Sequence, residues 1–301
     1  MGSDTDATAT SAQRIGILFS NTERLQVPAL RYLLLELNSV QKHFEYELLP
    51  NDMPESPLEV LNNDLRGIER IHLRDFEAPK FLIAYKEYLR NVSSRHGLQE
   101  EPPNFFILIT MATFIDNYYS TSPEFELTDP NSIAILALGN WEREMAPPSI
   151  LECILTMTIQ VSTEFVSPSF RHSIHLGTKG CICDFNANPK DTKFKVLNGY
   201  LCTSCRAVLV KDGLSDLADD IPRILSKGWL GTRSDPGSAA GILAHLKYDL
   251  FVTKGLSPTL WERFQKTLAE DGTKQVLDLV GKIILALVLL YLSLHGIKLK
   301  Q

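Results

Sequence analysis

The chain has 301 residues, a hydrophobic content of 44% and a formal net charge of −6. Its length allows one large or two modest domains, and its hydrophobic content is enough for a packed core. The acidic balance, without a prominent basic cluster, argues against a nucleic-acid partner. The N-terminus lacks the apolar segment of a secretory signal, so we expect a cytoplasmic, reducing setting. In that setting clustered cysteines bind metal more often than they form disulfides.

The N-terminal half alternates between apolar runs and helical patterns. Residues 1–13 are small and polar, and we expect them to be disordered. Continuous apolar runs at 14–20, 104–110 and 132–138 are typical of strands that are covered on both faces. A leucine-rich helix should start near Val27 and be followed by a second strand. Together with the strand at 14–20 they form a βαβ unit. The predicted fold is therefore α/β, with a mixed or mostly parallel sheet and flanking helices.

A helix beginning at the prolines before Ser149 is apolar nearly all round and should be central to the fold. Acidic residues and histidines near it give weak catalytic candidates, namely Glu144, Glu152 and His172, because a carboxylate and an imidazole around a cleft can do acid–base work. The simpler interpretation makes Glu144 a solvated loop charge and His172 a surface residue. The sequence contains no G-x-S-x-G nucleophile motif and no glycine-rich phosphate loop.

Four of the five cysteines lie within 25 residues of one another. Cys181 and Cys183 come first, and Cys202-x-x-Cys205 closes the segment. A C-x-x-C pair can turn both thiolates toward one ion, and two further donors about twenty residues upstream complete the tetrahedron that zinc prefers. The polar stretch 186–200 between the two pairs is expected to be a loop.

The upstream donors are less well defined by the sequence. If the stretch around Ile182 is extended, Cys181 and Cys183 point to opposite faces, and only a turn brings both to one ion. We therefore favour a structural zinc held by His175, Cys181, Cys202 and Cys205. Cys183 is the alternate ligand in place of His175, and Asp184 would accept a hydrogen bond from the zinc-bound His175. Free thiols without metal, and a redox role for the C-x-x-C pair, remain alternatives.

The segment from His172 to Leu209 resembles the end of archaemetzincin-type zinc proteases. In that family a cysteine and a C-V-M turn precede a closing F-C-x-x-C, and these cysteines hold a structural zinc. Cys181-Ile182 matches the C-V part, "YLCTSC" matches the closing pair, and His175 takes the place of the first cysteine. The resemblance implies a zincin-like domain over 14–210 with a zinc-binding segment at 172–209.

The resemblance does not extend to the catalytic metal. A zincin needs H-E-x-x-H on its central helix, because two histidines one turn apart face the same zinc. The corresponding helix here reads "SILECILTMTIQ" and has no histidine. The resemblance therefore implies a degenerate relative that has lost the peptidase chemistry.

Residues 211–301 are predicted to form a separate helical region. A helical stripe runs over 214–225, a linker is expected at 232–241, and an apolar helix spans 276–297. The stretch 279–297 is close to the length of a membrane span, so one interpretation is a tail anchor at the inner membrane face. The other is a helix buried against protein, for example in a homo-oligomer.

Three functional hypotheses follow. The first is a zinc-stabilised, non-peptidase α/β module that senses or binds a small-molecule or protein ligand and is coupled to the apolar C-terminal helix. The second is a metal-dependent hydrolase of unusual type. The third is a membrane-associated effector or scaffold that the α/β domain regulates.

Overall fold

The computed structural model describes residues 12–20, 22, 25–53, 58, 61, 76–114, 120–121, 132–139, 148–186 and 188–246. All of them belong to one compact unit that comprises residues 1–255. Most of the N-terminal segment 1–13, Glu144 and the predicted helix 276–297 lie outside the described residues. The domain boundary near residue 210 stays a prediction.

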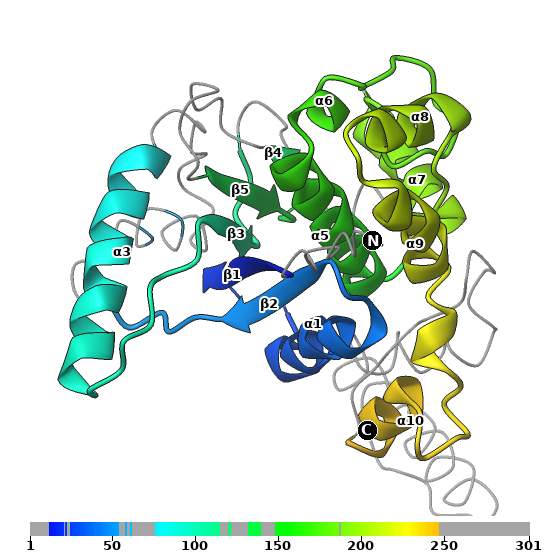
Figure 1. Cartoon of the computed structure of the whole chain (residues 1–301). Helices are drawn as coiled ribbons and strands as arrows, with labels where there is room; N and C mark the ends of the chain where they lie inside the picture. Colours follow the sequence, from blue (N-terminus) through cyan, green and yellow to red (C-terminus); the bar gives the residue numbers. More distant parts are fainter. Residues whose placement is uncertain are drawn as a thin grey trace, which may run out of the picture. The chain divides into compact units, whose positions relative to one another are not determined.

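The described part of the chain contains a five-stranded sheet in the order β2-β1-β3-β5-β4 (Figure 1). The four main strands pair in parallel, and the short β4 (Ser120–Thr121) runs antiparallel to β5 at the edge. The apolar runs that predicted strands form β1 (Gln13–Ser20), β3 (Phe105–Thr110) and β5 (Ser132–Ala137), while β2 spans Phe44–Leu48. The predicted α/β class with a mostly parallel sheet is confirmed.

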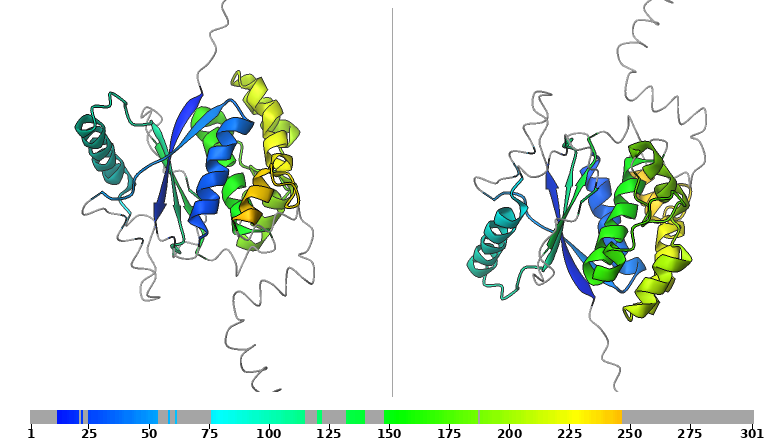
Figure 2. Two further views of the ribbon diagram at one scale, coloured as in Figure 1. Left: turned by 90° about the horizontal axis from the view of Figure 1, so that it is seen from below. Right: turned by 90° about the horizontal axis from the view of Figure 1, so that it is seen from above.

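Helices cover both faces of the sheet. Figure 2 shows α3 (Ala78–Arg95) on one face and α1 (Val27–Val40) with α5 (Ile150–Val166) on the other. The strand order explains this arrangement, since the chain steps outward from β1 to β2 and then returns past β1 to β3. Right-handed crossovers of opposite direction place their helices on opposite faces. Side chains alternate accordingly, so that in β3 Ile107 packs on the α1 side and Leu108 on the α3 side.

Helix α5 is buried from Leu151 to Phe165, because the sheet covers one side and later helices cover the other. Its first turn is closed by a capping box, in which Ser149 and Glu152 bond reciprocally to each other's backbone N–H. At its last turn Phe165 stacks on Phe105, with ring centroids 4.8 Å apart. The C-terminal end of α5 therefore lies beside the amino end of β3.

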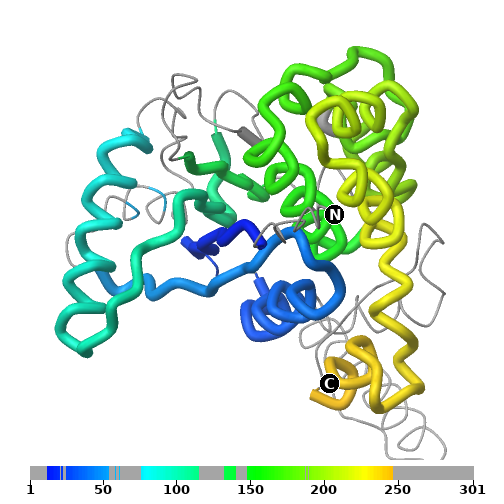
Figure 3. Tube along the Cα trace, viewed as in Figure 1, coloured from blue at the N-terminus to red at the C-terminus, as the bar shows by residue number. Residues whose placement is uncertain are grey.

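After α5 the chain forms an additional layer of short helices, which Figure 3 traces from α6 to α10. They are α6 (Pro168–Arg171), η3 (Pro189–Asp191), α7 (Thr192–Asn198), α8 (Thr203–Lys211), α9 (Ser215–Leu225), η4 (Gly228–Leu230) and α10 (Ala239–His245). The predicted stripe over 214–225 forms α9, which packs on α5. The predicted linker at 232–241 is wrong in its last residues, because α10 begins there. Ser238 caps this helix, and Ala239 and Ala240 in its first turn are buried.

No helix within the described ranges is long and apolar enough to cross a membrane. The predicted tail-anchor helix, and the oligomer that it would support, fall outside those ranges and stay predictions.

Candidate metal centre

Four donor side chains converge beside the C-terminal half of α5. The ligand atoms of His175, Cys181, Cys202 and Cys205 all lie within 4.8 Å of one another. Nε2 of His175 is 3.5 Å from Sγ of Cys202, and Sγ of Cys181 is 3.9 Å from Sγ of Cys205. All five cysteines are free thiols. The structure thus brings together the four residues that the sequence favours, and the ion itself stays a prediction.

A turn positions the upstream donors. The N–H of Asp184 donates to the carbonyl of Cys181 at 3.0 Å, closing a turn of four residues. Gly180, just before the turn, has a φ of +76°, and a Cβ there would overlap the side chain of Asn198. The turn runs beside His175, whose N–H donates to the carbonyl of Cys183 and whose carbonyl accepts from Phe185. The chain between residues 175 and 185 therefore folds back on itself and brings an imidazole and a thiol to one point.

The downstream donors lie at the start of a helix. Cys202 is the N-cap of α8, and Cys205 is in its first turn. Residues three apart on a helix share a face, and the positive end of the helix favours thiolates over thiols. The N–H of Cys202 also points at Sγ of Cys181, at 3.4 Å. The C-x-x-C pair thus presents both sulfurs to the upstream donors.

The expected loop at 186–200 is only partly a loop. It contains α7, which buries Val196 and Lys195 and ends at Gly199 with a φ of +54°. Helix α7 packs on α5, so contacts with a central helix, rather than helical periodicity in the segment itself, explain its formation. Tyr200 then accepts a hydrogen bond from the N–H of Ile182 and links the two pairs of donors.

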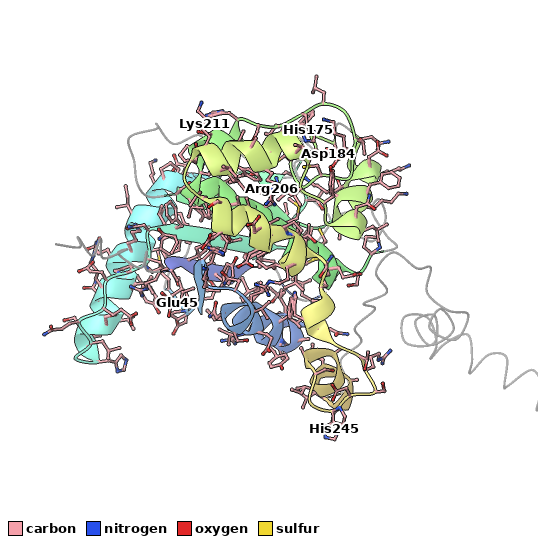
Figure 4. All side chains as sticks on the ribbon, turned by 45° about the vertical axis from the view of Figure 1, so that its right-hand side comes forward. Glu45, His175, Asp184, Arg206, Lys211 and His245 are labelled. Carbon is pink, nitrogen blue, oxygen red and sulfur yellow. The ribbon has the colours of Figure 1, made fainter. Side chains whose placement is uncertain are left out.

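Asp184 holds the imidazole of the cluster in place. Its Oδ1 lies 2.8 Å from Nδ1 of His175, and Figure 4 shows the two residues side by side. Its Oδ2 accepts hydrogen bonds from the backbone N–H of Lys179, Gly180 and Cys181, at 2.6 to 3.1 Å. A carboxylate at Nδ1 keeps the proton on that nitrogen and leaves the lone pair of Nε2 facing the sulfurs. Asp184 thus lies beside His175, where the sequence predicts an acceptor, and its hydrogen bond to a zinc-bound imidazole stays a prediction.

The electrostatics of the cluster favour a thiolate at Cys181, whereas the hydrogen bond with Cys181 raises the pKa of Cys205. Hydrogen bonds with Cys183 and Cys205 lower the pKa of Cys181, although its burial acts in the opposite direction. For His175, burial lowers the pKa, but hydrogen bonds with Cys181 and Cys202 outweigh it, and the pKa lies above its ordinary value. Cys153 is different, because burial inside α5 raises its pKa and it has no place in the cluster. The thiolate is the form that binds metal.

The donor set and its spacing fit zinc. Zinc takes sulfur at about 2.3 Å and imidazole nitrogen at about 2.0–2.1 Å in a tetrahedron, which places neighbouring donors about 3.5–3.8 Å apart. The 3.5 Å and 3.9 Å separations in the cluster are close to these values. The four protein donors equal the number of ligands that a tetrahedral zinc ion takes.

No family model and no curated protein matches the chain. A search of solved structures finds a likeness to archaemetzincin from Methanopyrus kandleri. The identity is 12%, the TM-score is 0.41, and the match covers 68% of this chain and 98% of that chain. It names the same family that the cysteine-rich segment resembles, but at this TM-score it assigns no site and no activity to this chain.

Cys183 lies next to the cluster but outside the group of four. Its thiol interacts with Cys181 and Cys205, and those hydrogen bonds together with burial raise its pKa. It is therefore suited to donate to the ligand sulfurs as a neutral thiol. Its role as the alternate ligand stays a prediction.

The catalytic candidates are not assembled into one site. Glu152 is bound within the capping box at the start of α5, and burial raises its pKa. His172 is exposed after α6, beyond the other end of α5. The length of α5 between them is about 20 Å, at 1.5 Å per residue. Glu144 lies outside the described residues.

A buried polar network beneath the cluster was missed by the sequence analysis. Nζ of Lys195 donates to Oε1 of Gln160 at 3.1 Å, and Nε2 of Gln160 donates to Oε1 of Glu164 at 2.8 Å. Lys195 also lies 3.4 Å from the carbonyl of Asp184, so a cation stands beside the anionic side of the cluster. The available signal was the pair of long polar side chains, Gln160 and Glu164, four residues apart on the predicted central helix.

Proposed function

We propose that the chain is a zinc-stabilised α/β protein without peptidase activity, which acts as a sensing or interaction module. One Zn²⁺ would be held by Nε2 of His175 and by the thiolates of Cys181, Cys202 and Cys205. Bound there, the ion supplies a cross-link between the turn at 181–184 and the start of α8. The observation that carries the proposal is the convergence of four protein donors within 4.8 Å, because four donors are what a tetrahedral zinc shell requires.

The place of the cluster in the fold supports a structural role. In open α/β sheets, ligands bind at the carboxyl ends of the strands. The cysteine-rich segment instead follows the C-terminal end of α5, which lies at the amino end of β3 through the Phe105–Phe165 contact. The cluster is thus on the side of the sheet where stabilising features are expected.

The local structure also supports a stabilising ion. The elements around the cluster are short, since α6 has four residues, η3 has three and α7 has seven. Helices of this length are not stable alone in water. A metal that binds only the folded segment adds its binding free energy to folding.

The absence of peptidase activity is inferred from the central helix. A zincin needs two histidines one turn apart on this helix, and residues 149–166 contain none. The one carboxylate at its start, Glu152, is engaged in a capping box. The coupling of the module to the apolar C-terminal helix is part of the proposal and rests on sequence alone.

Metal analysis of the purified full-length chain tests the proposal. We expect about one zinc per chain in the wild-type protein and in Cys153→Ala, which removes a buried thiol outside the cluster. Cys205→Ser should lose the zinc. Two zinc ions per chain would contradict a single closed structural site and indicate an additional catalytic metal. A wild-type protein without metal would contradict the proposed zinc site.

A further inference from the structure

Exposed apolar side chains are concentrated on the cysteine-rich segment. Among the described residues ten large hydrophobic side chains are exposed, and five of them lie between residues 174 and 200. They are Ile174, Leu176, Phe185, Phe194 and Tyr200, which we call the apolar rim. The others are scattered over several elements. Exposed apolar side chains that gather in one place mark interaction sites more often than single ones do.

The backbone around the donor cluster holds the apolar rim outward. His175 turns its side chain in toward the cysteines, so its neighbours Ile174 and Leu176 point away from them. Leu176 is 85% exposed. Phe185 donates its N–H to the carbonyl of His175 at 3.0 Å, which places it beside the same stretch. The apolar tips are therefore carried on a backbone that Asp184 fixes from within.

The same segment is basic, although the chain as a whole is acidic. Residues 168–211 contain seven lysines and arginines against two aspartates, whereas the full chain has 30 basic and 36 acidic residues. Asp184 and Lys195 are buried and Arg206 pairs with Asp219 on α9, which leaves five basic residues against Asp191. Arg171 and Lys179 flank the stretch with Leu176, and Nζ of Lys193 lies 5.4 Å from the ring centre of Phe194. The apolar rim is thus bordered by positive charge.

We propose that the apolar rim binds an anionic lipid surface. Leu176 and Phe185 would enter the interface between headgroups and acyl chains, while the basic side chains meet the negative headgroups. A second copy of the chain fits less well, because a two-fold interface places the same positive charges opposite each other. A partner with a groove would also accept apolar tips, but separate tips on loops suit a deformable surface better.

Co-sedimentation of the full-length protein with vesicles tests this proposal. We expect binding to phosphatidylcholine vesicles that contain phosphatidylserine, and much weaker binding to phosphatidylcholine alone or at high salt. Leu176→Ser should weaken binding about tenfold, since it removes one inserted side chain. Lys179→Gln should weaken it about fivefold, because each basic residue near an anionic surface contributes on that scale.

The matched control is Leu98→Ser, which removes an exposed leucine from a loop on the other side of the sheet and should leave binding unchanged. Equal binding by the wild type, Leu176→Ser and Leu98→Ser would overturn the proposal and assign binding to another part of the chain. Absence of vesicle binding would overturn it too. So would Leu176-dependent binding to a synthetic peptide of alternating glutamate and leucine without binding to vesicles, which would indicate a protein partner.

Zinc content measured on the same samples separates this proposal from the proposed function. Leu176→Ser keeps all four donors and should retain about one zinc per chain. A wild-type protein that binds vesicles through Leu176 but holds no zinc would support the lipid surface and contradict the metal site. A wild-type protein that holds about one zinc but does not bind vesicles would support the metal site and contradict the lipid surface.

Discussion

The sheet and the cysteine-rich segment are stabilised in different ways. Strands β3 and β5 bury almost every side chain, and the aromatic residues of α3 pack on them. The segment from 173 to 205 has short helices, isolated bridges and a turn, and polar donors meet at its centre. Burial of apolar area explains the first region, whereas hydrogen bonds to Asp184 and, as we propose, a shared zinc ion stabilise the second. One compact unit thus combines a core of packed apolar side chains with a segment arranged around polar donors.

Loss of a ligand should have the largest effect. Cys205→Ser removes a fully buried donor, and we expect the free energy of unfolding to fall by more than about 5 kcal/mol, because metal binding and folding are linked. Chemical denaturation with and without added zinc measures it. Limited proteolysis should cleave first between 173 and 205. Cleavage that begins in the sheet would contradict the division into two regions.

A cavity in the sheet region should be nearly as costly but should leave the metal in place. Phe81 on α3 is fully buried and stacks on Tyr85. Phe81→Ala should lower the free energy of unfolding by about 3–5 kcal/mol. The variant should keep about one zinc per chain, measured on the folded fraction. Loss of zinc from it would show that the two regions are not separately stabilised.

The carboxylate behind His175 offers a smaller test within the metal region. Asp184→Asn keeps the shape but loses the charge at Nδ1 and weakens three backbone hydrogen bonds. We expect zinc affinity to fall by about 10- to 100-fold, as for other residues that hydrogen-bond to a metal-ligating histidine. Competition with a chromophoric chelator gives the value. Asp191→Asn, at a partly exposed aspartate before α7, is the control and should bind zinc like the wild type.

The smallest expected effect concerns the pH dependence of α5. Burial raises the pKa of Glu152 above its ordinary value of 4.5, so the folded chain holds this proton to higher pH than the unfolded chain. The free energy of unfolding therefore decreases as pH rises from 4.5 through the raised pKa of Glu152. Below both pKa values Glu152 is protonated in the folded and the unfolded chain and has no such effect. The stability of the wild type relative to Glu152→Gln should fall over this range in urea unfolding. An increase would contradict the assignment to burial.

The sequence predicted the parts of this molecule whose signal is local. Continuous apolar runs gave β1, β3 and β5, because buried parallel strands leave no alternation to obscure them. The spacing of Cys202 and Cys205 was enough to predict a shared binding point, since a C-x-x-C pair can turn both thiolates toward one ion. That the pair opens a helix was not predicted.

Other parts depend on contacts between distant residues. The turn at 181–184 needs Gly180 against Asn198, and the burial of Lys195 needs Gln160 on α5. Helix α7 forms in a polar stretch because its Val196 finds a core to enter. The two-residue β4 has too few residues for any pattern. Such features arise from tertiary packing and leave little trace in a short window of sequence.

X-ray absorption at the zinc edge of the purified full-length protein is the decisive measurement of the metal site. We expect one zinc per chain with three sulfurs at about 2.3 Å and one imidazole nitrogen at about 2.0–2.1 Å. In His175→Ala reconstituted with excess zinc, the nitrogen signal should be absent and the sulfur distances should be unchanged. A shell dominated by oxygen and nitrogen, with an open position for water, would contradict the structural site. A shell of four sulfurs would contradict the choice of His175 over Cys183.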